Sequence, residues 1–206
     1  LVDQIIIKSP IPFLSKLFVF SYGFTVDGEI IYPPQEDEWM IQLSLENDTL
    51  PILTLTPFGA DGRFNNNLIH QVVTNEEAAD RLLDNLVFLM REKGYAGIDI
   101  DFEYILAEDR DYFTAFVQRT ADVMHANGVV VSVALAPKTS ADQPGLLYEG
   151  KNYGALGAAA DEVLLMTYEW GYKYGPPMAV APLNMVRRVL DYAVTEIEPA
   201  KINLGI

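Results

Sequence analysis

Cysteine is absent from the 206-residue sequence, and histidine occurs only twice. Without cysteine the chain has no disulfide, no thiolate zinc site and no cysteine nucleophile, and its compartment is left open. With only His70 and His125, a histidine-rich metal centre is not expected. The sequence therefore predicts chemistry that uses neither a metal nor a cofactor.

Hydrophobic runs of ~18 residues, the length needed to cross a bilayer, are also missing. Basic residues are few, because 14 lysines and arginines stand against 29 acidic residues and give a net charge of −15. A polyanion must be met by clusters of Lys and Arg, so neither a nucleic acid nor an anionic membrane is a predicted partner. The chain begins at Leu1 without a basic signal segment. We expect a soluble chain that is cut from something longer.

Half of the residues are apolar, which suits one sizeable core, and we predict a single domain over residues 1–206. The Asp27-Gly28 turn signal predicts a hairpin within residues 24–32. Buried apolar runs predict six strands, at residues 17–22, 50–56, within the acidic segment 94–105, and at 129–136, 162–168 and 201–206.

Helices are predicted between the later strands. The first begins with the capping-box pair Thr74 and Glu77 and ends at Gly94. The acidic run at residues 36–38 and the side chain of His70 are predicted to lie on the solvated surface.

Strands that alternate with helices predict parallel βαβ units. Six such strands could form an open doubly wound sheet or an incomplete barrel. No glycine-rich phosphate loop follows any strand, and the chain stops inside a strand without a closing helix. We therefore predict an α/β fold of the (β/α)₈ TIM-barrel class that lacks some of its strands.

Asp99, Asp101 and Glu103 recur at every second position, with apolar residues between them. Because both faces of a parallel sheet are covered, alternating acids are predicted to line the barrel interior. Burial of three acids is costly unless they are paired, protonated or near the wet C-terminal mouth. Glu103, the nearest to that mouth, is the predicted reactive group. A structural polar ladder without chemistry is the alternative.

The segment AGIDIDFE (residues 96–103) resembles the signature D-G-x-D-x-D-x-E of family 18 glycoside hydrolases, the chitinase-type barrels. FVFSYGF is similar to the second strand of that family, ALAPKTSADQPGLLYEG to the fifth, LLMTYEWGYKYGPPMAVAP to the sixth and KINLGI to the seventh. The resemblance is closest to the branch of bacterial spores and cell walls, which cleaves cortex peptidoglycan and often carries LysM modules. It implies that the first and eighth barrel strands are not in these 206 residues.

The resemblance also implies a substrate-assisted, retaining mechanism, in which the 2-acetamido group of the sugar attacks the anomeric carbon. Glu103 would protonate the leaving oxygen and then activate water. Asp101 would orient the acetamido group, and Asp99 would share a proton with Asp101. Tyr168 matches the family tyrosine whose hydroxyl binds the acetamido oxygen.

Two positions depart from the family pattern. Its first Asp is Ala96 here, at the start of the strand and far from the reacting bond, so we expect little effect on catalysis. Its Asp after the strand-six tyrosine is Glu169, which can still accept a hydrogen bond from a sugar hydroxyl but whose extra methylene is expected to reshape the sugar site and favour a different glycan. Tyr22 and Trp170 are predicted to stack on sugar rings and Met166 to contact the acetamido methyl. Core packing is the alternative for these three.

The resemblance thus implies a glycosidase that cleaves β-1,4-linked N-acetylglucosamine bonds in peptidoglycan or, as a second choice, in chitin. Its predicted partner is an N-acetylglucosamine-containing glycan, and its predicted location is the spore, the cell envelope or the secreted fraction. The competing prediction is a lectin-like barrel that binds glycan without turnover. Such relatives typically lack the acid, so Glu103 favours an enzyme.

Overall fold

Within the described residues, seven strands form one sheet in the order β2-β1-β3-β4-β5-β6-β7. The structure is a computed structural model, and it describes residues 4–59, 61–171 and 174–206. The strands are β1 (Lys16–Phe24), β2 (Ile30–Ile31), β3 (Leu50–Leu55), β4 (Gly97–Ile100), β5 (Val130–Leu135), β6 (Glu162–Leu165) and β7 (Ile202–Leu204). The helices are α1 (Gln4–Lys8), α2 (Glu38–Leu45), α3 (Asn67–Val73), α4 (Glu76–Lys93), α5 (Arg110–Ala126), α6 (Tyr153–Ala159) and α7 (Leu183–Glu196), with short 3₁₀ turns η1 (Ile11–Phe13), η2 (Ala107–Asp109) and η3 (Pro199–Lys201).

Neighbouring strands are parallel except β2, which is antiparallel to β1. Gly23 pairs with Ile31 and Phe24 with Ile30, so the predicted hairpin is confirmed. At least one helix joins each pair of neighbouring parallel strands, for example α5 between β4 and β5 and α6 between β5 and β6. The six predicted parallel strands and their βαβ connections are therefore confirmed.

An ion pair between Lys16 of β1 and Glu162 of β6 shows how strongly the sheet curls. In the sheet order β3, β4 and β5 lie between these two strands. Strands about 4.8 Å apart in a flat sheet would place β1 and β6 about 19 Å from each other, beyond the reach of the two side chains. The sheet is therefore curved as in a barrel, and the open doubly wound alternative is excluded.

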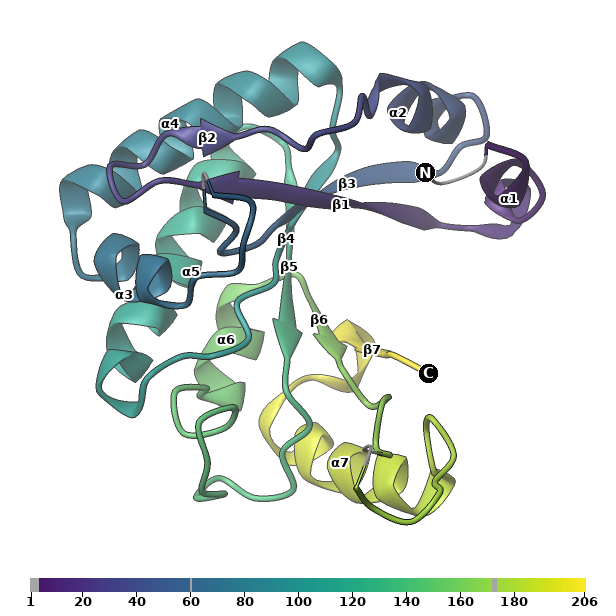
Figure 1. Ribbon diagram of the computed structural model, residues 1–206, viewed down its shortest axis with the longest axis vertical. Helices are drawn as coiled ribbons and strands as arrows, with labels where there is room; N and C mark the ends of the chain where they lie inside the picture. Colours follow the sequence, from purple (N-terminus) through teal and green to yellow (C-terminus); the bar gives the residue numbers. More distant parts are fainter. Residues whose placement is uncertain (1–3, 60, 172–173) are drawn as a thin grey trace.

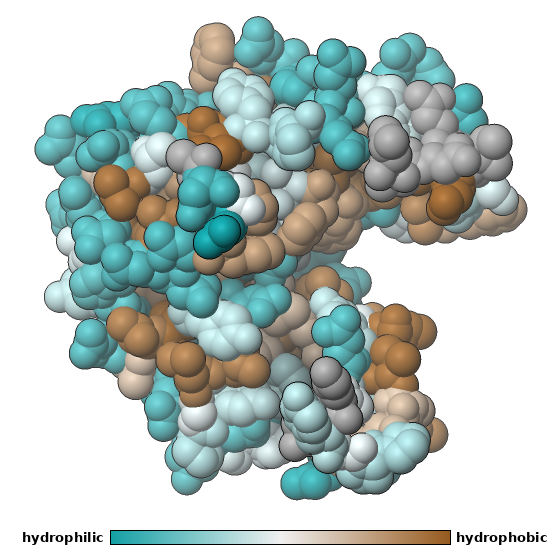
Figure 2. All heavy atoms as spheres, viewed as in Figure 1, coloured by the Kyte–Doolittle hydropathy of each residue, from teal (hydrophilic) through white to brown (hydrophobic). Residues whose placement is uncertain are grey.

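The curved sheet does not close, because β1 and β7 are not neighbours in it. Figure 1 shows β1 and β7 on either side of the opening, with α4, α5 and α6 along the opposite, outer side. Figure 2 shows the molecule hollowed on the open side, between the part that holds β1 and the part that holds α7 and β7. The described strands have the arrangement of the predicted incomplete α/β barrel.

The apolar residues that alternate with the three acids, in β4 and just beyond it, lie on the outer side of the sheet. Ile98, Ile100 and Phe102 are fully buried. The ring of Phe102 stacks on Phe116 of α5, with centroids 5.9 Å apart and an interplanar angle of 17°. Because side chains alternate along a strand, Asp99 faces the opposite, interior side of the sheet.

Helix α4 ends as predicted but begins one residue later. Gly94 ends it with a φ of 86°, a left-handed conformation that favours glycine. The N-cap is Asn75, whose side chain accepts a hydrogen bond of 3.2 Å from the Ala78 N–H, and not Thr74. Thr74 instead ends the preceding helix α3. Thr and Asn are both favourable N-caps, so their adjacent positions left the start ambiguous.

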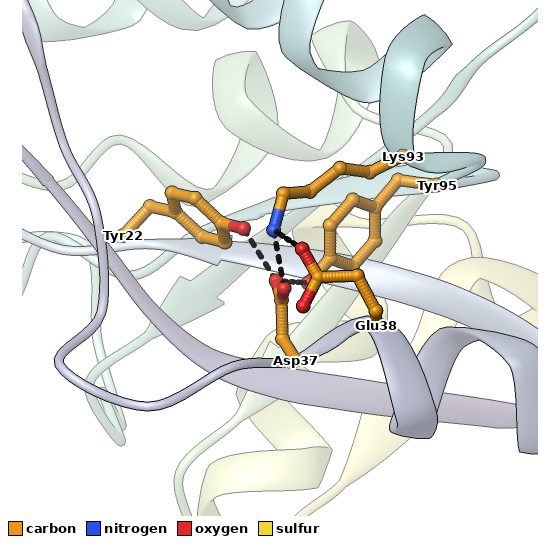
Figure 3. Close-up of polar contacts among 5 residues, drawn as sticks. All are labelled: Tyr22, Asp37, Glu38, Lys93 and Tyr95. Atoms are coloured by element: carbon orange, nitrogen blue, oxygen red, sulfur yellow. Dashed lines mark hydrogen bonds and ion pairs between the residues drawn. The ribbon is translucent and has the colours of Figure 1, made fainter.

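The acidic run at residues 36–38 is not simply a solvated face, which corrects the prediction. Asp37 is 1% exposed and accepts hydrogen bonds from the hydroxyls of Tyr22 and Tyr95 and from the Lys93 ammonium. Glu38, which is exposed, binds Lys93 at 2.7 Å. Figure 3 shows these five side chains converging from β1, α2, the end of α4 and the segment that precedes β4. The cluster joins the start of α2 to the end of α4, the helix before β4.

Helices α2 and α3 were not predicted from the sequence. His70 lies in α3 and is partly buried, and its Nδ1 lies 2.8 Å from a carboxylate oxygen of the buried Asp109.

None of the helices in the described ranges combines the length and the apolar composition that a bilayer crossing requires.

Candidate active site

Asp99 lies in the middle of the parallel sheet. It pairs in register with Thr54 of β3 and Ser132 of β5, so three polar residues share one level of the interior. The Asp99 side chain is 3% exposed, and its Oδ1 atom has no hydrogen-bond partner. Burial raises the pKa of Asp99 to about 7, a hydrogen bond with Ser132 opposes the shift, and the charge of Asp101 adds to it. This carboxyl group therefore keeps its proton in weakly acidic solution.

Asp101 and Glu103 lie just beyond β4, which ends at Ile100. The prediction that all three acids belong to one strand is thus wrong for Asp101 and Glu103. The Asp101 N–H nevertheless donates a hydrogen bond to the Leu55 carbonyl at 3.0 Å. Asp101 is partly buried, whereas Glu103 is exposed. In a barrel this end of the strands carries the active site. Glu103 thus lies where a substrate can reach it.

The pKa of Asp101 is raised to about 6 by burial and by the charge of Glu103, while Lys151 lowers it. Two neighbouring carboxyls, Asp99 and Asp101, thus both bind protons more tightly than usual. A pair of this kind titrates in coupled steps, and near neutral pH it can hold a single shared proton. The prediction that Asp99 and Asp101 act as a proton-sharing pair is consistent with these pKa directions.

Tyr168 brings a hydroxyl to the same end of the sheet, three residues after the end of β6. Its side chain is partly buried. Burial raises the pKa of Tyr168, and the charges of Asp101, Glu103, Glu169 and Asp99 raise it further. These electrostatic interactions place Tyr168 near Asp99, Asp101 and Glu103, and the catalytic roles of the four residues remain predictions. The hydroxyl therefore stays protonated and can donate a hydrogen bond.

Met166, Glu169 and Trp170 surround Tyr168 in the sequence. The Met166 N–H donates to the Leu135 carbonyl at 3.0 Å, and its side chain is partly buried. Glu169 is exposed and has a positive φ of 58°. Trp170 packs against the core, and its Nε1 donates to the Thr167 carbonyl at 3.0 Å. Their predicted contacts with sugar remain predictions.

Tyr22 does not lie where the sequence predicted it. Its side chain is fully buried, and its hydroxyl donates to Asp37, so it has no ring face open to a sugar. The pairing of β1 with β3 shifts register between Val19 and Tyr22, a bulge that changes which face the later side chains occupy. Tyr22 therefore belongs to the core, the alternative considered for it above.

Lys151 is the site residue that the sequence did not indicate. It is completely buried in the loop between β5 and α6, and its Nζ atom has no hydrogen-bond partner. Burial lowers the pKa of Lys151 to about 8, against the opposing charges of Asp101 and Glu103. In the described part of the chain, the buried side-chain atoms without a partner are Asp99 Oδ1, Asp101 Oδ1 and Lys151 Nζ. No local sequence pattern distinguishes this lysine from a surface lysine.

This arrangement of side chains can donate and accept protons. It combines an exposed carboxylate, a proton-holding pair of acids behind it and a protonated tyrosine hydroxyl, and these are the elements of general acid–base catalysis. Within the described ranges, no group of three or more His, Asp or Glu side chains is arranged to hold a metal ion. The acidic groups lie at the C-terminal end of the curved sheet, where α/β-barrel enzymes carry their active sites.

The chain belongs to glycosyl hydrolase family 18, because the sequence profile of that family matches residues 54–206. It is 39% identical over 194 residues to the cortical fragment-lytic enzyme of Bacillus subtilis, which covers 94% of this chain and 44% of that protein. The crystal structure of the spore cortex-lytic enzyme SleL of Bacillus megaterium superimposes with a TM-score of 0.91 and 34% identity, covering 98% of this chain and 46% of that one.

A chitinase from Chromobacterium violaceum also superimposes, with a TM-score of 0.91 and 25% identity, covering all of this chain and 65% of the other. The chain spans less than half the length of the two Bacillus relatives. Both parts of the resemblance seen in the sequence, the family and its spore and cell-wall branch, are therefore confirmed.

Proposed function

We propose that the protein is a glycosidase that cleaves β-1,4-linked N-acetylglucosamine bonds in peptidoglycan of the spore cortex or cell wall. The observation that carries the proposal is the exposed Glu103 beyond β4, backed by two acids whose pKa values are raised to about 6 and about 7. The names of the Bacillus relatives support a cortex or cell-wall substrate. Such a substrate lies outside the cytoplasm, and we propose that the protein acts there.

The mechanism we propose uses one catalytic acid and the substrate's own acetamido group. Glu103 donates its proton to the glycosidic oxygen while the acetamido oxygen attacks the anomeric carbon, which gives a cyclic oxazolinium-type intermediate and releases the leaving sugar. Glu103, now a carboxylate, then takes a proton from the water that opens this ring. The configuration at the anomeric carbon is retained, because it is inverted twice.

Asp101 and Tyr168 hold the attacking group. The Asp101 carboxylate accepts the acetamido N–H and offsets the positive charge that grows on the ring, while the Tyr168 hydroxyl donates to the acetamido oxygen. Asp99 supplies a place for the proton that Asp101 gives up. The raised pKa of Asp99, about 7, suits that role because the group can keep a proton while Asp101 is ionised.

Two other functions are weaker candidates. Chitin is a second substrate, favoured by the likeness to the Chromobacterium chitinase. A lectin-like barrel that only binds glycan is the second class of function. The presence of an exposed Glu103 argues against it, because a binding protein has no need for an acid that can reach the glycosidic oxygen.

The test compares the full-length protein with its Glu103→Gln variant on cortex muropeptides and on chitooligosaccharides, with products identified by mass spectrometry. Loss of a general acid–base group lowers turnover by about 10²- to 10⁴-fold, while the glycan should still bind. Glu108→Gln, which removes an exposed carboxylate five residues away, is the matched control and should keep its activity. Turnover that survives in Glu103→Gln, or binding without turnover in the natural protein, would refute the proposal.

A further inference from the structure

A lysine ammonium is sealed inside the molecule next to the acids of the site. The Lys151 side chain has no exposed surface, and no hydrogen bond satisfies its Nζ atom. Burying a charged group without a partner costs several kcal/mol unless opposite charge lies nearby. Lysine is rarely buried in this way, so its position requires an explanation.

The loop that carries Lys151 is fixed against the segment that carries Glu103. A Cβ at Gly150 would lie 2.3 Å from the Ile105 carbonyl oxygen, so the two backbones are in close contact. The Lys151 N–H donates to the Tyr148 carbonyl at 3.1 Å, and the Lys151 carbonyl accepts from Lys138 Nζ at 3.0 Å. The backbone at Lys151 is thus held from both sides, next to the end of β4.

A second buried lysine in the same loop shows what a purely structural lysine looks like. Lys138 is 1% exposed, and its Nζ donates to the carbonyls of Ala141 and Lys151, both at 3.0 Å. It therefore bridges two turns of the loop. Lys151 makes no such bridge, and the groups that its charge acts on are the carboxylates of Asp101 and Glu103.

We propose that Lys151 is a positioning residue of the active site, a built-in counter-cation that keeps Asp101 in the ionised form that receives the acetamido N–H. This inference rests on the proposed function for its catalytic consequence. Lys151 itself touches no substrate, because it is completely buried. It acts through Asp101, whose Oδ1 is likewise buried and without a partner.

The charges around Asp101 agree with this role. Asp99 and Glu103 come from its own segment, Tyr168 from the segment after β6, where Glu169 also lies, and Lys151 from the loop after β5. Burial and Glu103 raise the pKa of Asp101, and Lys151 is the cation that lowers it. Removal of the ammonium must therefore raise the pKa of Asp101, and the carboxyl would then stay protonated to a higher pH.

The test measures this titration directly in full-length protein labelled with ¹³C-aspartate. In Lys151→Met the carboxyl midpoint of Asp101 should rise by about one pH unit, the lower end of the effect of a nearby opposite charge. Near pH 5, kcat/KM should then fall about tenfold, with the loss nearly gone above about pH 8. The melting temperature should not fall near pH 5, because the variant no longer buries an ammonium without a hydrogen bond and Asp101 can take up a proton there. If Lys151→Met does not fold, Lys151→Gln should show the same shift.

Lys138→Met is the matched control. It should lower the melting temperature, because the carbonyls of Ala141 and Lys151 lose their donor and the second of these bonds is buried, and it should leave the Asp101 midpoint in place. An unchanged midpoint in the Lys151 variants, or the same shift in Lys138→Met, would overturn the inference. A natural protein that titrates as expected but cleaves no glycan would refute the proposed function and leave the Lys151–Asp101 interaction supported.

Discussion

Tyr168 packs its ring directly against Gly205. A Cβ built at Gly205 would lie 2.4 Å from Tyr168 Cε1 and 2.6 Å from Cδ1, closer than real atoms approach. The segment around Gly205 is held in place, because its N–H donates to the Leu165 carbonyl at 2.9 Å and its carbonyl accepts from the Thr167 hydroxyl at 2.7 Å. The glycine thus determines where the Tyr168 hydroxyl lies.

Gly205→Ala should therefore move Tyr168 and lower activity. A displacement of about 1 Å in a group that positions substrate can cost about 10²-fold in rate, so we expect kcat/KM to fall by 10- to 100-fold with little change in folding. Steady-state kinetics and circular dichroism measure the two effects. Gly154→Ala in α6 is the control, since its nearest contact is the mobile end of the Glu196 side chain. Full activity in Gly205→Ala would show that the Tyr168 position is not critical.

The sequence located the acidic site because its pattern is local. The alternation of Asp99, Asp101 and Glu103 with apolar residues identified the interior face, and a longer match identified the family. The sequence pattern misplaced the end of β4. Side chains keep alternating beyond the last hydrogen bond between paired strands, so periodicity cannot show where strand pairing stops. It also missed Lys151, whose role depends on the approach of Gly150 to Ile105, a contact between separate loops.

Asp99→Asn should stabilise the protein more at high pH than at low pH. The folded-state pKa of Asp99, about 7, lies above the ordinary value of 3.8, so the folded state favours the protonated form. Stability from this group is present below about pH 4 and is lost as the pH rises through about 7. Three pKa units correspond to about 4 kcal/mol as an upper limit. Asparagine carries no charge at either pH.

Thermal unfolding near pH 4 and near pH 8 measures this difference. The melting temperature of Asp99→Asn relative to that of the natural protein should rise between the two conditions. Asp84→Asn removes the same charge from the exposed face of α4 and controls for the change in net charge. An equal difference at both pH values would mean that Asp99 does not hold a proton in the folded protein.

Asp37→Asn should have the opposite pH dependence. Burial alone would raise the pKa of Asp37, but hydrogen bonds from Lys93, Tyr22 and Tyr95 lower it below its ordinary value. Its contribution to stability is therefore present above about pH 4 and is lost as the pH falls through the lowered folded-state pKa. Removing one partner of a buried ion pair costs about 3 to 5 kcal/mol, and we expect a loss of about that size near pH 7.

Glu38→Gln provides the matched control for the cluster in Figure 3. Glu38 binds the same ammonium, but its side chain is 62% exposed. Exposed ion pairs contribute about 1 kcal/mol or less, so chemical denaturation should separate the two variants clearly. Equal losses in both would show that burial of Asp37 is not what makes its bonds strong.

The same cluster shows why Tyr22 does not face a sugar, since its hydroxyl binds the buried Asp37. Strict alternation from Lys16 would put Tyr22 on the interior side of β1, and no sequence signal marks the bulge that follows Val19. The acidic run at residues 36–38 reads as exposed because its partners, Lys93 and Tyr95, lie more than fifty residues away. Composition and local spacing cannot predict contacts between residues so far apart in the sequence.

Substrate assistance makes a prediction about the substrate itself. A retaining enzyme with a protein nucleophile needs a second carboxylate about 5 to 5.5 Å from the acid and across the sugar from it. Asp101 lies two residues before Glu103 on the same segment, so it approaches from the same side and is poorly placed to attack. Asp99 is buried more deeply still. The acetamido oxygen of the substrate is therefore the expected nucleophile.

De-N-acetylated oligomers should then be cleaved at least about 10²-fold more slowly than acetylated ones, because the nucleophile is missing. A thiazoline analogue of the cyclic intermediate should inhibit, since it resembles a species that is bound more tightly than substrate. Asp101→Asn and Tyr168→Phe should each lower kcat on acetylated substrate, because both side chains are proposed to hold the acetamido group. Equal cleavage of both substrates, or a glycosyl ester trapped on any Asp or Glu by mass spectrometry, would exclude substrate assistance and require a carboxylate nucleophile.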